Sequence, residues 1–200
     1  QELVQKGLGG FLVRHMESYG ILDTMGLTSR TVLDANIYTM NNRAEAFWMK
    51  KGILGDTVPL ELNAKELVHR NNKNSELTVY GYTPMMVSVQ CVQKTMDHCN
   101  HACVQYVLKD RYQKEFRGVC SCEFCYNTIY NTLPTSLLKE KEKAEKLGVK
   151  AYRLSFTTET QQETEKIVRA FVDVYLRGQK PDGQMQTEET TKGHFQRGVE

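Results

Sequence analysis

The sequence predicts a mixed α/β protein in which short strands alternate with helices to form a parallel sheet covered by helices. Short apolar runs recur in the first part of the chain, with starts about 20 to 25 residues apart, which is the spacing of consecutive strand–helix units. The segments between these runs have the apolar periodicity of helices. The expected strands lie at residues 9–14, 31–34, 56–60 and 77–80.

The clearest of the expected helices covers residues 41–51. Ala44, Phe47 and Trp48 share one face of this helix because they are three and four residues apart. Gly52 follows directly and is a typical stop signal. The same pattern predicts further helices at residues 63–69 and 17–25.

Four strand–helix units make half of an eightfold βα barrel, and they also fit a small open sheet. A half-barrel alone leaves two sheet edges unpaired and apolar helix faces uncovered. We therefore expect residues 1–90 to be completed by an N-terminal half-barrel of the same protein or by a second copy of the chain. The sequence does not begin with Met, which agrees with a piece of a longer protein.

Three further segments are expected after this half-barrel. Residues 91–132 form a cysteine-rich segment, residues 133–177 a helix–strand–helix extension, and residues 178–200 a polar tail or linker. Thr160 and Glu163 have the spacing of a capping box and open the last helix. The elements expected in the extension are a helix at 136–147, a strand at 152–156 and a helix at 160–176.

The composition excludes several classes of protein. Of the 200 residues, 40% are hydrophobic and 25% are charged, which argues against a disordered or fibrous chain. The net charge of +2 does not indicate a nucleic-acid-binding protein. No apolar run approaches the ~20 residues of a membrane-spanning helix, and no signal peptide is visible at the start. We therefore expect a cytoplasmic protein with no membrane partner.

All six cysteines lie between residues 91 and 125. Structural cysteines would be scattered through a core, so the clustering indicates shared chemistry. Disulfides need an oxidising compartment, so a metal or iron–sulfur site is the better interpretation. The candidate ligands are the CxxC pair Cys122 and Cys125, the second pair Cys91 and Cys99, and the alternates Cys103 and Cys120.

Spacing alone allows both a four-cysteine zinc site and a four-cysteine iron–sulfur cluster, because both need thiolates. His98 and His101 favour zinc, since imidazole is a good zinc ligand. A redox-active dithiol at Cys122 and Cys125 is a third interpretation, but it needs a helix after the motif, where the sequence predicts a strand or loop. Buried thiols without metal are the fourth, and the clustering argues against them.

Polar residues follow the expected strands, and in a βα barrel functional residues lie where strands end. Arg14 is the best suited to bind a carboxylate or phosphate, because a guanidinium can donate two parallel hydrogen bonds. Ordinary roles compete: Asn36 and Asn63 fit helix caps, Glu61 a surface ion pair and His15 a loop. The full set of candidates is Arg14, His15, Glu17, Asp34, Asn36, Glu61, Asn63, Tyr80 and Tyr82.

Residues 106–117 predict a β-hairpin, with its turn between Asp110 and Lys114. Lys and Arg side chains at 109–117 can contact phosphate, so RNA is a candidate partner. The excess of basic over acidic residues in this part of the chain is small, and a solvated hairpin is the simpler interpretation.

Four segments occur in order along the chain: YGYTPMMVSVQC at 80–91, LKDR at 108–111, CEFCYNTIYN at 122–131 and GHFQRGVE at 193–200. The first resembles the stretch YGxxPxMVSxQC of the collagenase-like peptidase family (peptidase family U-thirty-two), and the second and third resemble that family too. The last is similar to the family signature GHFKRGVE, with Gln196 in place of Lys.

The resemblance implies that residues 1–90 are the second half of a (β/α)8 TIM-type barrel, followed by a cluster-binding segment and a small α/β extension. It implies an iron–sulfur cluster, of the four-iron type, and so reverses the preference for zinc. The cysteines that match the family positions best are Cys91, Cys99, Cys122 and Cys125.

The resemblance also implies a function. Relatives hydroxylate a ribosomal-RNA cytidine, a tRNA uridine or ubiquinone precursors, and prephenate is implicated in the RNA reactions. The parent protein is then an iron–sulfur-dependent RNA hydroxylation enzyme, and the fragment alone lacks an intact active site.

Two other functions stay open. One is a peptidase acting on collagen-like chains, although the sequence contains no HExxH or GxSxG motif. The other is a zinc-stabilised interaction module without catalysis. A single metal centre on the four cysteines requires Cys91 and Cys99 to lie close to Cys122 and Cys125.

Overall fold

The computed structural model describes residues 2–97, 99–181 and 189–198. The chain divides into two compact units, each of which draws on several stretches of sequence. The first unit comprises Gln1–Val79, Glu140–Arg153 and Lys192–Glu200. The second unit comprises Tyr80–Lys139 and Leu154–Thr191.

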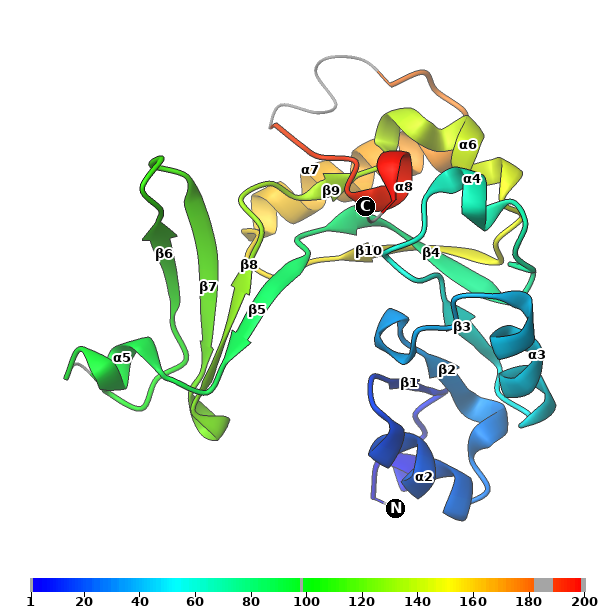
Figure 1. The fold of residues 1–200 in the computed structure, drawn as a ribbon, viewed down its shortest axis with the longest axis horizontal. Helices are drawn as coiled ribbons and strands as arrows, with labels where there is room; N and C mark the ends of the chain where they lie inside the picture. The colour runs from blue at the N-terminus through cyan, green and yellow to red at the C-terminus, as the bar shows by residue number, and fades with distance from the viewer. Residues whose placement is uncertain (1, 98, 182–188, 199–200) are drawn as a thin grey trace. The chain divides into compact units, whose positions relative to one another are not determined.

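A sheet of short strands forms the base of the first unit (Figure 1). Its first four strands pair in chain order, each parallel to the next, and the tenth strand of the chain lies beside the fourth. All four strands predicted in the first part of the chain are confirmed. The strands are β1 (Phe11–Val13), β2 (Thr31–Leu33), β3 (Gly55–Thr57), β4 (Ser75–Gly81) and β10 (Ala151–Ser155).

Two helices of the first unit begin at residues whose side chains cap them. Asn41 accepts hydrogen bonds from the backbone N–H groups of Arg43 and Ala44, which confirms the predicted start of α3. Asn63 and Glu66 form a capping box at the start of α4. The helices are α1 (Glu2–Gln5), α2 (Met16–Thr24), α3 (Asn42–Lys50), α4 (Ala64–Leu67), α6 (Lys141–Lys146) and α8 (His194–Arg197).

The apolar core of the first unit lies between the sheet and helices α2 and α3. Tyr19 of α2 meets Trp48 of α3 edge to face, with ring centroids 4.8 Å apart. Val13, Leu33 and Ile53 complete the buried cluster. Trp48 therefore packs into the core as the periodicity predicts, whereas Phe47, predicted on the same face, is 54% exposed.

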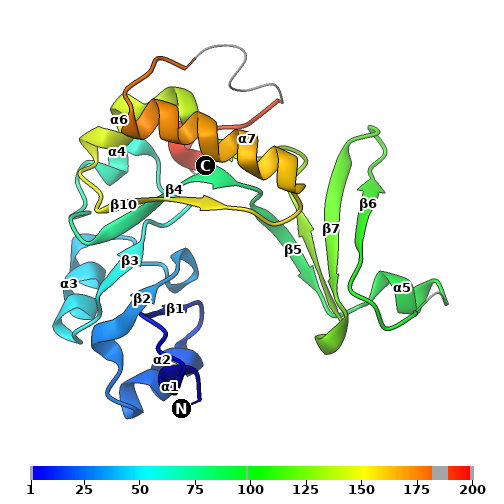
Figure 2. The same ribbon diagram turned by 180° about the vertical axis from the view of Figure 1, so that it is seen from behind.

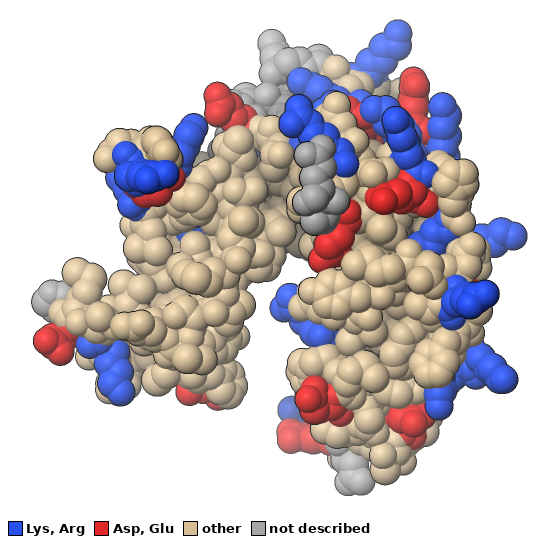
Figure 3. All heavy atoms as spheres, viewed as in Figure 1, with Lys and Arg blue, Asp and Glu red and all other residues tan. Residues whose placement is uncertain are grey.

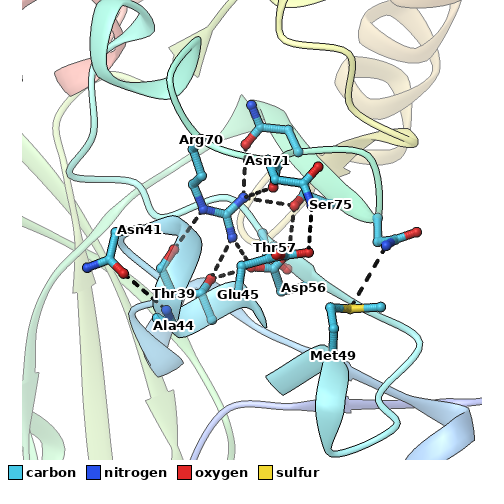
Figure 4. Close-up of polar contacts among 12 residues, drawn as sticks. Thr39, Asn41, Ala44, Glu45, Met49, Asp56, Thr57, Arg70, Asn71 and Ser75 are labelled. Carbon is cyan, nitrogen blue, oxygen red and sulfur yellow. Dashed lines mark hydrogen bonds and ion pairs between the residues drawn. The ribbon is translucent and has the colours of Figure 1, made fainter. Parts of the chain in front are cut away.

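Arg70 and Asp56 form a buried ion pair in the same unit (Figure 4), with side chains only 2% and 4% exposed. The guanidinium also donates to the Thr39 carbonyl oxygen over 2.8 Å and to the Asn72 side-chain oxygen over 2.9 Å. The carboxylate accepts hydrogen bonds from the hydroxyl groups of Thr39 and Ser75. A buried ion pair is tolerated when its remaining donors and acceptors are satisfied, and these contacts satisfy them.

The second unit contains a four-stranded antiparallel sheet in the order β5-β8-β7-β6. The hairpin of β6 and β7 pairs Tyr106 with Gly118, which confirms the predicted hairpin. The Tyr106 ring lies across Gly118, where a Cβ atom would come within 2.3 Å of it. The strands are β5 (Pro84–Ser88), β6 (Gln105–Lys109), β7 (Glu115–Ser121) and β8 (Tyr126–Tyr130).

The rest of the second unit packs around Tyr80, at the end of β4. Strand β9 (Thr135–Ser136) pairs antiparallel with this end of β4. Helix α7 (Gln161–Phe171), at the front in Figure 2, brings Phe171 to within 6.1 Å of the Tyr80 ring, centroid to centroid. Thr160 and Glu163 form the predicted capping box of α7, whose last turn continues as a π-helix at Val172–Leu176.

The expected fold class, the second half of a TIM-type barrel with a cluster-binding segment and a small α/β extension, is wrong. After β4 the chain enters β5 of a separate antiparallel sheet, so the strand–helix alternation stops there. Strand β10, which was expected in the extension, lies beside β4 in the first sheet. The architecture is mixed α/β, because the local apolar patterns predict strands but not their partners.

The segment expected to be a polar tail contains structure where it is described. Thr191 forms an isolated bridge with Thr135, and Phe195 of α8 is buried. Among the described residues, no helix combines the length and the apolar character needed to cross a membrane.

Asp56→Ala is expected to reduce the stability of the first unit by about 3–5 kcal/mol, because it leaves the Arg70 guanidinium buried without its counter-ion. Urea unfolding followed by the fluorescence of Trp48, the single tryptophan of the chain, measures this unit. Glu145→Ala is the control, since the half-exposed Glu145 pairs with Lys141 over 3.4 Å and such pairs contribute about 1 kcal/mol or less. Equal effects of the two substitutions would contradict the role given to Asp56.

Candidate metal centre

All six cysteines belong to the second unit and are free thiols. Two of them are buried and the other four are partly or fully exposed. Cys91 precedes helix α5 (Val92–Thr95), and Cys99 and Cys103 lie in the connection from α5 to β6. Cys120 lies in β7, and Cys122 and Cys125 flank the short turn between β7 and β8.

Cys99, His101 and Cys122 form a group that can hold a metal ion. Their ligand atoms all lie within 4.8 Å of one another. Two thiolates on one tetrahedral zinc ion are separated by about 3.8 Å, given zinc–sulfur bonds of about 2.3 Å. Small side-chain movements therefore suffice to bring the three residues around one ion.

Two further thiols lie beside Cys122. The Cys122 backbone N–H donates to the Cys103 sulfur over 3.4 Å. The Cys125 thiol donates to the Cys122 carbonyl oxygen over 3.7 Å. Either thiol is a candidate fourth ligand.

The turn between Cys122 and Cys125 is a single 3₁₀ turn, and the chain enters β8 directly after it. A redox-active CxxC motif sits at the start of a helix, which lowers the pKa of the first thiol. The strand that follows here agrees with the prediction and removes the basis for that interpretation.

Backbone strain is concentrated near this group. His101 and Cys125 have φ values of 55° and 52°, and Asp97 has 56°. Residues with a Cβ atom rarely adopt this left-handed conformation, which costs about 1–2 kcal/mol each. Strain of this kind is typical of residues held in place for a function.

Burial raises the pKa of the Cys122 thiol, and the charges of the neighbouring thiols raise it further. The neighbours that act in this way are Cys99, Cys103, Cys125 and Cys91. Several thiolates cannot ionise together at such close range without a compensating cation. A bound metal supplies that cation and removes the repulsion.

Cys91 and Cys120 form a separate buried pair, with sulfur atoms 3.7 Å apart. Burial, together with the hydrogen bond to Cys91, raises the pKa of Cys120 to about 11. A hydrogen bond from the backbone N–H of Lys94 lowers the pKa of Cys91. In this pair the first proton therefore leaves from Cys91.

The four cysteines selected from the sequence are thus brought together in part. Cys99 and Cys122 share the three-residue group, and Cys125 lies beside Cys122. Cys91 lies against Cys120 instead. His101 belongs to the group, whereas His98 lies outside the described residues.

Among the strand-end candidates, Arg14 and Asp34 are brought together in the first unit. The Arg14 Nε atom lies 2.9 Å from one oxygen of Asp34, and Arg153 of β10 lies 2.9 Å from the other. Arg153 also pairs with Glu76. Arg153 and Glu76 were not singled out from the sequence. The only signal for Arg153 was its position opposite the apolar side of its strand.

His15, Glu17 and Ser18 form an exposed local cluster at the start of α2. Glu17 lies 3.2 Å from Nδ1 of His15. The Ser18 oxygen is 3.3 Å from both ring nitrogens, so it is not directed at one of them. The cluster therefore lacks the directed serine–histidine hydrogen bond of a peptidase triad.

The other strand-end candidates have ordinary environments. Asn36 is exposed, and Asn63 caps α4. Glu61 is partly buried, with one oxygen that has no hydrogen-bond partner. Tyr80 and Tyr82 are buried in the second unit, where the Arg117 guanidinium lies 4.8 Å from the Tyr82 ring centroid.

Comparison of the chain with protein-family models, with curated proteins and with solved structures found no match. The family resemblance stays a prediction from the sequence motifs, and the case for a metal centre depends on the geometry of the thiols.

The reduced chain is expected to bind Co²⁺ with the absorption of cobalt–thiolate bonds, and Cys99→Ser and Cys122→Ser should each weaken binding by 10-fold or more. Binding should weaken as the pH falls, because protons compete for thiols such as Cys122, whose pKa is raised. Cys120→Ser is the matched control, since Cys120 lies outside the group. An equal loss of Co²⁺ affinity in all three variants would contradict the assignment of Cys99 and Cys122 as ligands.

Proposed function

We propose that this chain carries a thiolate-bound iron–sulfur cluster and is part of a protein that hydroxylates RNA. The observation that supports the cluster is geometric: Cys99 and Cys122 belong to one group of ligand atoms within 4.8 Å of one another, and the thiols of Cys103 and Cys125 lie beside Cys122. A cluster needs thiolates at its corners, and the second unit supplies more of them than one zinc ion needs.

Cys99 and Cys122 are the ligands that the geometry favours most. Cys91 and Cys125 complete the set if the family resemblance holds, and Cys103 is the nearest substitute because it already accepts the N–H of Cys122. When bound, such a cluster supplies electron transfer at a potential set by its ligands, its burial and its hydrogen bonds.

A zinc-stabilised interaction module is the second candidate, and one observation favours it. His101 shares the group with Cys99 and Cys122, and mixed sulfur and imidazole ligation is typical of zinc. In that case the metal only stabilises the segment around it.

The RNA part of the proposal is supported by the motif resemblance and by the tip of the β6–β7 hairpin. Figure 3 shows basic side chains gathered at this tip beside an acidic group. Tyr112 is 68% exposed there, and the Arg111 guanidinium lies 4.7 Å from its ring centroid. An exposed aromatic ring with an adjacent guanidinium is suited to stacking an unpaired base. Lys109 is already paired with Glu115.

Anaerobic purification should yield a brown protein with about four iron and four sulfide per chain. Cys99→Ser and Cys122→Ser should lose most of both. His101→Ala separates the candidates, because it should leave iron loading unchanged but weaken zinc binding. The cluster would be rejected in favour of the zinc module if the wild type were colourless with one zinc per chain and His101→Ala bound no zinc.

The full chain should bind single-stranded RNA, and Tyr112→Ala should weaken binding by about 5-fold or more, as expected for the loss of one stacked base. Fluorescence anisotropy with a short labelled RNA measures this. Tyr38→Ala is the matched control, since Tyr38 is 56% exposed but lies in the first unit. Equal binding by wild type and Tyr112→Ala would remove the hairpin tip from the proposal.

A further inference from the structure

Cys91 and Cys120 form a buried pair of thiols, and neither belongs to the Cys99, His101 and Cys122 group. Their sulfur atoms are 3.7 Å apart, and their residues are 6% and 0% exposed. The contact joins residues 29 positions apart in the sequence.

The antiparallel sheet holds this contact in place. Asn127 of β8 pairs with Ser88 of β5 on one side and with Cys120 of β7 on the other. The Asn127 side-chain N–H donates to the Gln90 carbonyl oxygen over 2.9 Å. This bond anchors the chain directly before Cys91, so the Cys91 thiol is directed at Cys120.

A disulfide requires a sulfur–sulfur distance of about 2.05 Å and Cβ atoms about 3.5–4.5 Å apart. The two thiols are already in van der Waals contact, so rotation of their side chains supplies most of the approach. Because the sheet fixes the backbone on both sides, the two thiols also meet at a high effective concentration.

We propose that Cys91 and Cys120 form a reversible disulfide in the metal-free chain, and that this bond withdraws Cys91 from the metal centre. The oxidant is a low-molecular-weight disulfide. The Cys91 sulfur attacks one sulfur of this small disulfide. The sulfur–sulfur bond of the small disulfide breaks, a mixed disulfide with Cys91 forms and one small thiol leaves. The Cys120 sulfur then attacks the mixed disulfide and releases the second small thiol. The two cysteine protons and two electrons end on the two small thiols.

The second half of this inference rests on the proposed function, because it assumes that Cys91 is a cluster ligand. Reduction then frees Cys91 for the cluster, and oxidation holds it against Cys120. Cys120 acts as a regulatory thiol and is not itself a ligand.

The disulfide is tested on the metal-free full chain in a redox buffer of reduced and oxidised glutathione. Trypsin releases Cys91 in a peptide spanning 74–94, and Cys120 in one spanning 118–139 together with Cys122 and Cys125. Mass spectrometry should find these peptides cross-linked in the wild type and in Cys122→Ser and Cys125→Ser. The cross-link should be lost in Cys120→Ser. Its absence from the wild type, or its persistence in Cys120→Ser, overturns the pair.

The regulatory step is tested by iron and sulfide uptake after the same treatment. Oxidised wild type should take up at least 5-fold less iron than reduced wild type, whereas Cys120→Ser should load equally after either treatment. Equal loading of oxidised and reduced wild type overturns the regulation while the disulfide stands. If reduced wild type takes up no iron, the proposed function fails, and the peptide map still decides whether the pair exists.

Discussion

The ion pair between Arg70 and Asp56 compensates for the shortness of the strands around it. Strands β1, β2 and β3 have three residues each, so their ladders supply few hydrogen bonds. The guanidinium and carboxylate join β3 to the start of β4 and to the loop that carries Thr39. A network of this kind gives the short strands a defined arrangement only while every member is satisfied. The first unit therefore depends on this buried pair as well as on its apolar core.

The second unit has longer strands and a different constraint, which is the crowding of several thiols around Cys122. Strand β7 has seven residues and pairs on both sides, so it can hold Cys120, and the start of the turn at Cys122 directly after it, in fixed positions. The exposed thiols lie on the connections at its ends, where the backbone can adjust to an ion. A rigid sheet with adjustable loops is a suitable scaffold for a metal centre.

Local structure could be predicted from the sequence because its signals are local. The capping residues Asn63 and Thr160, and the apolar face around Trp48, act within a few residues. Strand partners could not be predicted in the same way. Residues 84–88 read PMMVS and have no polar–apolar alternation, and nothing in the sequence near β10 indicates that it lies beside β4.

In the candidate site, too, some features could be predicted from the sequence and others could not. The clustering of cysteines correctly predicted a group that can hold a metal, with Cys99 and Cys122 in it. It could not predict the contact of Cys91 with Cys120, because that contact depends on the register that places Ser88, Asn127 and Cys120 in one row. No sequence pattern predicts the Arg70 network either, since its members are single polar residues at separate positions of the sequence.

Under the proposed function, folding of the cysteine-rich segment is coupled to metal binding. The left-handed backbone at His101 and Cys125 raises the free energy of the segment. Burial and the neighbouring thiols raise the pKa of Cys122, so its thiol stays protonated without a metal. A bound cation would stabilise the thiolates, so its binding energy would also order the segment. Without metal, a cross-link between Cys91 and Cys120 would instead close the span between them and lower the entropy of the loosened chain. In this proposal the disulfide of Cys120 with Cys91 stabilises the segment when no metal is bound.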